Sequence, residues 1–153
     1  MNEKNDGQKV LVFDNAINEL EIISKIVENM GYEPLKCSKI SNAISELNEH
    51  ENSICKIIFD LNMPTRGFNE DQIKRSNSGR ATGWVWYMDN IVNNAHLKER
   101  FIKNTLIYSG SEFLSELSRI IKSDEEKKLL SKVRQVTKGM PNSRNLIKDF
   151  LKN

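Results

Sequence analysis

The chain has 153 residues, of which 38% are hydrophobic and 29% are charged, as is typical of one globular domain. The formal net charge of +2 is too small to favour nucleic acid or an anionic membrane surface as a partner. No apolar run approaches the roughly 20 residues that span a bilayer, and the polar start lacks the apolar centre of a signal peptide. We expect a disordered lead-in over residues 1–8 and a single domain over 9–153.

The two cysteines, Cys37 and Cys55, lack the spacing of a disulfide framework or a zinc site. We interpret them as buried thiols, which predicts a protein of the reducing cytoplasm.

The first half of the chain alternates between short apolar runs and amphipathic segments. The segments over 10–13 and 55–59 read as buried central strands of a parallel sheet. Apolar residues spaced three to four apart predict helices over 17–30 and 40–50, and 32–37 is a plausible short strand. This β-α-β-α-β order implies right-handed crossovers and parallel strands.

The stretch from Thr65 to Thr82 is rich in charged, amide and glycine residues and poor in apolar ones. We expect a long polar loop there, and loops of that length in a compact domain are usually functional covers or disordered segments. Both ends of the loop would lie near the proposed site, so we predict a mobile cover that restricts access to Asp60. Its basic side chains would either meet a phosphoryl group or an acidic partner, or simply be solvated.

The second half of the chain predicts a helix over 84–102 and a strand over 105–108 that stops at Ser109. Trp84 and Trp86 cannot share one helix face, so we expect one in the core and the other under the polar loop.

Apolar spacing then predicts a helix from Phe113 to Ile121, and Ser123 with Glu126 matches a capping box for a further helical turn. A fifth strand is predicted over 133–137, although this segment would equally extend the helix before it. A final short helix follows Asn142 or Ser143.

Both central strands end on a carboxylate, Asp14 after the first and Asp60 after the third. In open α/β sheets, ligands bind at the carboxyl ends of the strands, so the two side chains would meet at one edge. Two neighbouring carboxylates repel each other unless a cation or a proton lies between them. Oxygen ligands favour Mg²⁺ as that cation.

The segment Asp60-Leu61-Asn62-Met63-Pro64 after an apolar strand resembles the phosphoacceptor segment of bacterial response-regulator receiver domains. The resemblance covers about 9–151 and implies an α/β fold, a doubly wound five-stranded parallel sheet of the flavodoxin-like type, here with a long insertion after the third strand. It implies that Asp60 is the phosphoacceptor, that Ser109 is the switch hydroxyl and that Lys138 faces the phosphoryl group. It also implies that Mg²⁺ is held by four ligands: Asp14, Asn15, Asp60 and the carbonyl of Asn62.

Two positions differ from the family pattern. The family usually has a second acid where this chain has Asn15, so we expect weak Mg²⁺ binding. The family lysine is normally followed by proline, whereas Lys138 is followed by Gly139. These differences leave two functions open, each in a stand-alone domain that signals through protein contact. One is a phosphoacceptor that receives its phosphoryl group from a histidine kinase or phosphotransfer protein and signals to an unidentified downstream protein, with at most self-catalysed phosphoryl uptake and hydrolysis. The other is a phosphorylation-independent pseudo-receiver that binds proteins.

A third interpretation is a phosphatase of the haloacid dehalogenase type, which also uses a strand-end aspartate. That family needs a second aspartate two positions after the first, where this chain has Ala16. It also needs a later acidic pair at a strand end, and Asp124-Glu125 is instead predicted in a polar helical stretch.

Overall fold

The computed structural model describes residues 8–152. The predicted lead-in over 1–8 lies outside the described residues except for Gln8. Within the described part, no helix is both long and apolar enough to cross a membrane.

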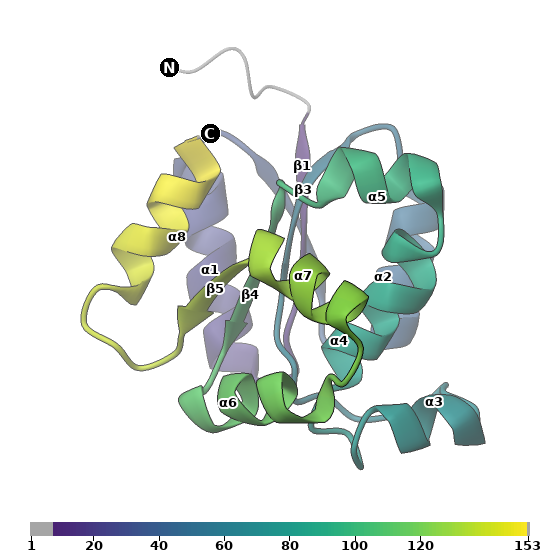
Figure 1. Ribbon diagram of the computed structural model, residues 1–153. Coiled ribbons are helices and arrows are strands. Elements are labelled where there is room, and N and C mark those ends of the chain that lie inside the picture. Colours follow the sequence, from purple (N-terminus) through teal and green to yellow (C-terminus); the bar gives the residue numbers. More distant parts are fainter. Residues whose placement is uncertain (1–7, 153) are drawn as a thin grey trace.

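Five parallel strands form one sheet in the order β2-β1-β3-β4-β5 (Figure 1). The strands are β1 (Lys9–Phe13), β2 (Glu33–Cys37), β3 (Ile54–Phe59), β4 (Thr105–Ser109) and β5 (Arg134–Thr137). In the register, Phe13 pairs with Phe59 and Phe59 pairs with Ile107, so the carboxyl ends of the central strands lie level with one another. The predicted doubly wound five-stranded sheet is confirmed, including the fifth strand.

Helices cover both faces of the sheet (Figure 1). One face carries α1 (Ile17–Asn29) and α8 (Ser143–Lys152). The other carries α2 (Ile40–His50), α4 (Thr82–Tyr87), the π-helix η2 (Met88–Val92), α5 (Ala95–Phe101) and α7 (Asp124–Lys132). Two apolar layers result, because alternate residues of each strand point to opposite faces.

The insertion, residues 65–82, is not the continuous polar loop expected from its composition. It contains a short helix, α3 (Glu70–Arg75), which begins at a reciprocal capping box between Asn69 and Gln72. Arg75 of α3 forms ion pairs with Asp71 and with Asp89 of η2. Local capping and charge pairs therefore order a segment that has few apolar residues.

The single helix predicted over 84–102 is also wrong, because the segment is divided into α4, η2 and α5. The break lies at Asn94, whose side chain accepts hydrogen bonds from the backbone N–H groups of His96 and Leu97 and so starts α5. The apolar spacing continues across the break, which is why the pattern resembled one helix. His96 is exposed, as expected of a surface residue.

Both tryptophans of α4 are buried, and Trp84 is the one that lies beside the insertion, near Asn77. Trp86 packs edge-on against Phe13 with ring centroids 4.7 Å apart. Trp84 stacks on Tyr87 and donates an indole hydrogen bond to Glu126 of α7 over 2.7 Å. One face of α4 therefore packs against the sheet through Trp86, and Trp84 contacts the neighbouring helix α7.

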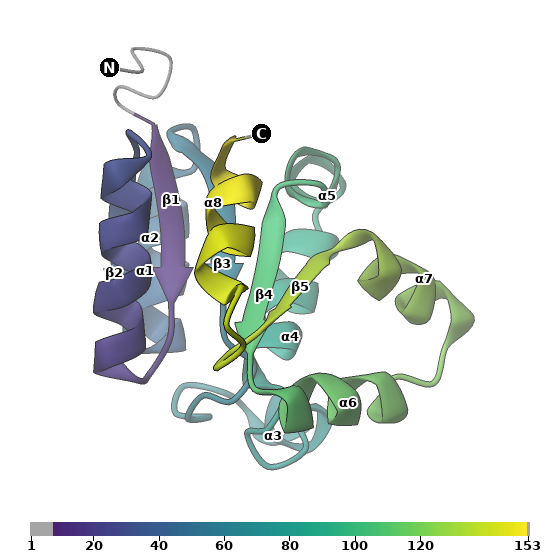
Figure 2. The ribbon, with the colours of Figure 1, turned by 90° about the vertical axis from the view of Figure 1, so that its left-hand side faces the viewer.

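The helix α6 (Ser111–Ile120) lies below the sheet, beside α3, on the side to which the strand arrows point (Figure 2). A short extended segment then leads into α7, where Ser123 accepts a hydrogen bond from the N–H of Glu126. The predicted helix start at Ser123 is confirmed. The insertion and α6 together occupy the carboxyl edge of the sheet, which is the edge where the sequence predicts a site.

Candidate functional site

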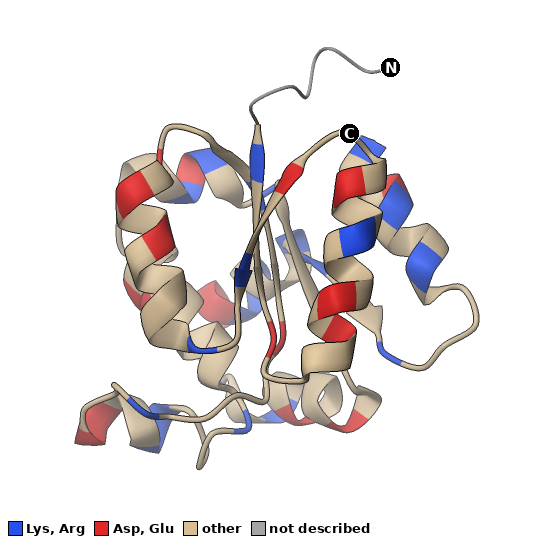
Figure 3. Cartoon of the chain, turned by 180° about the vertical axis from the view of Figure 1, so that it is seen from behind, with Lys and Arg blue, Asp and Glu red and all other residues tan. Residues whose placement is uncertain are grey.

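Four polar side chains meet at the carboxyl edge, each from a different strand. Asp14 follows β1, Asp60 follows β3, Ser109 ends β4 and Lys138 follows β5. In Figure 3, acidic residues mark the lower ends of two central strands. The sheet order places these four strands side by side, so chain segments far apart in sequence contribute to one site.

Asp60 is the centre of this site. Ser109 Oγ donates a hydrogen bond to Asp60 Oδ1 over 2.6 Å, and Lys138 Nζ donates one to Asp60 Oδ2 over 3.1 Å. Lys138 Nζ also forms an ion pair with Asp14 Oδ2 at 2.6 Å. Because both carboxylates contact the same nitrogen, they lie close enough to share one ion, as predicted.

Backbone hydrogen bonds fix these side chains in place. The N–H of Asp60 donates to the Phe13 carbonyl over 3.1 Å, and the N–H of Lys138 donates to the Ser109 carbonyl over 2.9 Å. Ser109 Oγ also accepts a hydrogen bond of 3.4 Å from the N–H of Leu61. The hydrogen-bonding pattern of the sheet thus continues one residue beyond β3 and β5, which places the side chains of Asp60 and Lys138 at the same edge.

The charges of the site depend on one another. Asp14 and Asp60 are only 1% and 5% exposed. Burial, together with the neighbouring charge of Asp60, raises the pKa of Asp14 to about 6, although Lys138 opposes the shift. Burial would lower the pKa of Lys138, but the carboxylates of Asp60 and Asp14 outweigh it and raise that pKa. Lys138 is therefore protonated at neutral pH and offsets the carboxylate charge.

The donor set fits a hard divalent cation. Asp14 Oδ2 is buried, and its close partner is the ammonium of Lys138 at 2.6 Å. Asp14 and Asp60 supply only oxygen atoms, the ligands that Mg²⁺ prefers. A bound Mg²⁺ would be held by Asp14 and Asp60, and would supply positive charge beside Asp60.

The structure leaves two predicted ligands outside the hydrogen-bonded cluster. The side chain of Asn15 is exposed and is not hydrogen-bonded to another residue of 8–152, and the predicted ligand of Asn62 is its backbone carbonyl, which makes no hydrogen bond within the cluster. Their roles as metal ligands therefore stay predictions.

Sequence reasoning missed a second group of residues, which hold the loop after Asp60. Thr82 Oγ1 donates a hydrogen bond of 2.7 Å to the Met63 carbonyl, and the N–H of Met63 donates to the Gly79 carbonyl over 3.3 Å. The N–H of Gly83 donates to the Leu61 carbonyl over 3.1 Å. We call residues 79–83 the clasp; the Thr-Gly pair that ends the insertion was its only sequence signal.

The insertion also contacts α6. Asn77 Nδ2 donates a hydrogen bond of 3.0 Å to Glu116 of α6, and Arg80 forms an ion pair with the same carboxylate. The Arg80 guanidinium lies 4.9 Å from the centre of the Phe113 ring. Because the clasp holds the Asp60 loop, the insertion connects that loop to the helix that follows Ser109.

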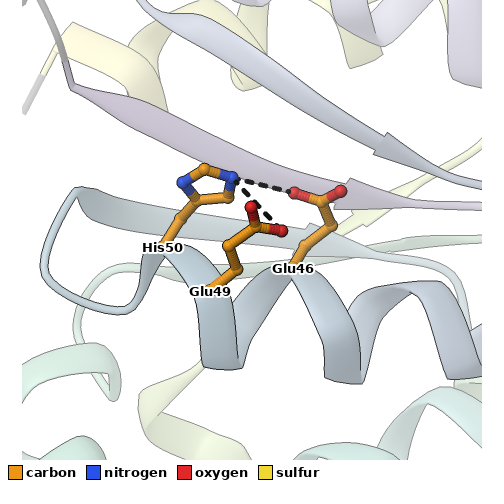
Figure 4. A group of neighbouring side chains, drawn as sticks. All are labelled: Glu46, Glu49 and His50. Atoms are coloured by element: carbon orange, nitrogen blue, oxygen red, sulfur yellow. Dashed lines mark ion pairs between the residues drawn. The ribbon is translucent and has the colours of Figure 1, made fainter.

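Two other acidic groups lie elsewhere. Glu46, Glu49 and His50 form a surface cluster on α2, with His50 Nε2 lying 3.5 Å from Glu46 and 3.9 Å from Glu49 (Figure 4). This cluster precedes β3, at the amino edge of the sheet. Asp124 and Glu125, the acidic pair considered for a phosphatase, are exposed in the first turn of α7 and follow no strand.

No protein-family model and no curated protein matches the sequence. Solved structures do match in fold. The chemotaxis response regulator CheY4 of Vibrio cholerae aligns with a TM-score of 0.61 and 17% identity, over 95% of this chain and 96% of that one. A response regulator receiver domain protein from Clostridium thermocellum aligns with a TM-score of 0.55 and 18% identity, over 95% of this chain and 94% of that one. A sensor protein from Polaromonas sp. JS666 aligns with a TM-score of 0.63 and 12% identity, over 95% of this chain and 93% of that one.

These structural similarities extend over nearly the whole chain. Because fewer than a fifth of the aligned residues are identical, they establish the fold and nothing more. The chain has the fold of response-regulator receiver domains, with an ordered insertion after the third strand.

Proposed function

We propose that this protein is a phosphoacceptor receiver domain, which takes a phosphoryl group on Asp60 and signals through protein contacts. The observation that carries the proposal is the contact of Asp60 with both Ser109 and Lys138, at 2.6 Å and 3.1 Å. A strand-end carboxylate of this kind is a competent nucleophile, and its two neighbours are the donors that an added phosphoryl group needs.

The chemistry follows from these contacts. A carboxylate oxygen of Asp60 attacks the phosphorus of a phosphohistidine on a histidine kinase or phosphotransfer protein. The new P–O bond forms as the P–N bond breaks, and the imidazole nitrogen keeps the electron pair and takes up a proton. The ammonium of Lys138 offsets charge that develops on the phosphoryl oxygens, as cations do in other phosphoryl transfers. The Ser109 hydroxyl exchanges its bond to Asp60 for one to a phosphoryl oxygen.

Mg²⁺ belongs to this proposal as the ion that supplies positive charge beside Asp60, held by the oxygens of Asp14 and Asp60 with Asn15 and the Asn62 carbonyl as further ligands. We propose weak binding, because an amide at position 15 contributes no negative charge. The free thiols of Cys37 and Cys55 fit a reducing, cytoplasmic compartment.

The proposal is tested by incubating the protein with a small phosphodonor and Mg²⁺ and measuring its intact mass. We expect one added phosphoryl group, located on Asp60 by peptide mapping and absent from Asp60→Asn. The exposed carboxylate of Asp124 provides a control, because Asp124→Asn should be modified like the wild type. A correctly folded protein that never gains mass, with a kinase or with the small donor, would contradict the proposal.

One observation favours the pseudo-receiver as the second candidate. Lys138 contacts both Asp60 and Asp14, so its ammonium occupies the space between the carboxylates where a cation would otherwise be needed. In a pseudo-receiver this ion pair is permanent and the fold acts only as a protein-binding module. Such a protein would show no Mg²⁺-dependent uptake of a phosphoryl analogue such as beryllofluoride.

A further inference from the structure

A groove of about 460 Å³ lies between the insertion, α4 and the junction of α6 with α7. Its floor is apolar, with buried Trp84, Val85 and Ile121 flanked by the half-buried Met88 and Ile120. This volume lies within the range of about 300–1,000 Å³ that is typical of ligand-binding clefts.

The rim of this groove is basic. Lys74, Arg119 and Lys122 are exposed, and none of them forms an ion pair with another residue of 8–152. Arg75, also in the lining, already pairs with Asp71 and Asp89. Among residues 8–152, the lining of the groove contains one acidic side chain, Glu126. Its carboxylate already accepts the indole hydrogen bond of Trp84.

We propose that this groove binds an acidic segment of a protein partner, with an apolar side chain of the segment on the floor and carboxylates at Lys74, Arg119 and Lys122. Charge complementarity and an apolar centre within a polar rim are the features that such an interface needs. A nucleic acid is less well matched, because the net charge of the chain is only +2 and the floor of the groove is apolar.

The groove exists in the unphosphorylated protein, so this binding goes beyond the proposed phosphoryl transfer and does not require it. One wall carries Asn77, which is hydrogen-bonded to Glu116 of α6, and the first two residues of α4 belong to the clasp that holds the Asp60 loop. An occupant would therefore contact the structural connection between the phosphoacceptor loop and α6.

The test is selection from a phage-displayed library of random peptides of about 12 residues, on unphosphorylated protein without phosphodonor and with EDTA. We expect the selected peptides to be acidic and to contain a large apolar residue. In fluorescence anisotropy, their affinity should fall about tenfold or more for the groove variant K74E/R119E/K122E and should weaken with salt. Replacing the apolar residue of the peptide by serine should weaken binding as well.

A matched control reverses three exposed charges elsewhere, K25E/K103E/K148E, which changes the net charge equally and should leave binding intact. Circular dichroism and thermal melting establish that both variants fold. The proposal is overturned if no peptide is enriched on the wild type relative to the groove variant, or if selected peptides bind both variants alike. It is also overturned if single-stranded DNA instead of peptide binds the wild type but not the groove variant, or if the wild type forms a dimer that the groove variant does not.

Discussion

Gly83 lies against the backbone carbonyl of Asp60 so closely that a β-carbon at position 83 would be 2.1 Å from that oxygen. It would also be 2.7 Å from the ring of Phe59, which is fully packed in the core. Only glycine fits between α4 and the end of β3 without displacing backbone. The conformation of the proposed phosphoacceptor therefore depends on a residue without a side chain at the end of the insertion.

Gly83→Ala is expected to destabilise the protein by about 3 kcal/mol or more, because the clash involves main chain that cannot move aside as a flexible side chain would. The free energy of unfolding is measured by urea denaturation. Gly110→Ala is the matched control, since a β-carbon there would meet only the Phe113 ring at an ordinary 3.5 Å. Equal stability of the two variants would mean that α4 does not approach Asp60 as described.

Loss of the Arg80–Glu116 ion pair should loosen α6. Arg80 connects the insertion to the middle of this helix, so Arg80→Ala is expected to increase backbone hydrogen exchange over 111–120 while leaving α1 unchanged. Arg75→Ala is a useful comparison, because Arg75 pairs with Asp89 of η2 and not with α6. If exchange in α6 rises equally in both variants, the effect is general destabilisation.

Asp14→Asn should stabilise the metal-free protein at neutral pH. The folded pKa of about 6 lies above the ordinary 3.8, so ionisation of Asp14 favours the unfolded state. The loss of folding free energy caused by this ionisation is absent below about pH 4 and grows as the pH rises to about 6. Above that pH it is constant, at up to about 3 kcal/mol. Thermal melts in EDTA should show a higher midpoint for the variant at pH 7.5 and nearly equal midpoints at pH 4; a variant less stable at pH 7.5 would contradict this.

Asn15→Asp should tighten Mg²⁺ binding by roughly tenfold, because cation affinity depends on the charge of the ligands. Calorimetric titration of the wild type and the variant measures the difference directly. The exposed Asn93→Asp substitution on another surface provides a control for net charge. Identical Mg²⁺ affinities in all three proteins would show that residue 15 is not a ligand.

The strand-end residues could be predicted because each is a local pattern. An apolar run followed by Asp14 or Asp60 needs no tertiary information, and parallel strands bring such ends to one edge. The contact between Ser109 and Asp60 then follows from the sheet order. The loop geometry around Lys138 depends on packing, yet the lysine does reach Asp60 although Gly139 follows it where the family has proline.

The features that could not be predicted depend either on contacts between distant segments or, as at Asn94, on a local cap that the apolar pattern conceals. The apolar spacing of 84–102 did not reveal the break at Asn94, because apolar residues face the core both before and after it. Trp84 is buried because α7 covers it, and Arg75 orders α3 by pairing with Asp89 some 14 positions away. Composition alone made the insertion resemble a loop.

The insertion should still control access to Asp60. It leaves the edge after Pro64 and returns through the clasp, and the Asp60 side chain is only 7% exposed, so we expect a donor to approach Asp60 past the insertion. Replacing 66–75 by a short glycine-serine turn retains the clasp, and we expect faster phosphorylation of Asp60 by a small donor, measured by intact mass. Arg75→Gln, which loosens α3 without removing it, should give a smaller increase in rate. Unchanged rates in both variants, with native circular dichroism, would identify residues 66–75 as an inert insertion whose only structural role is to form the wall of the groove.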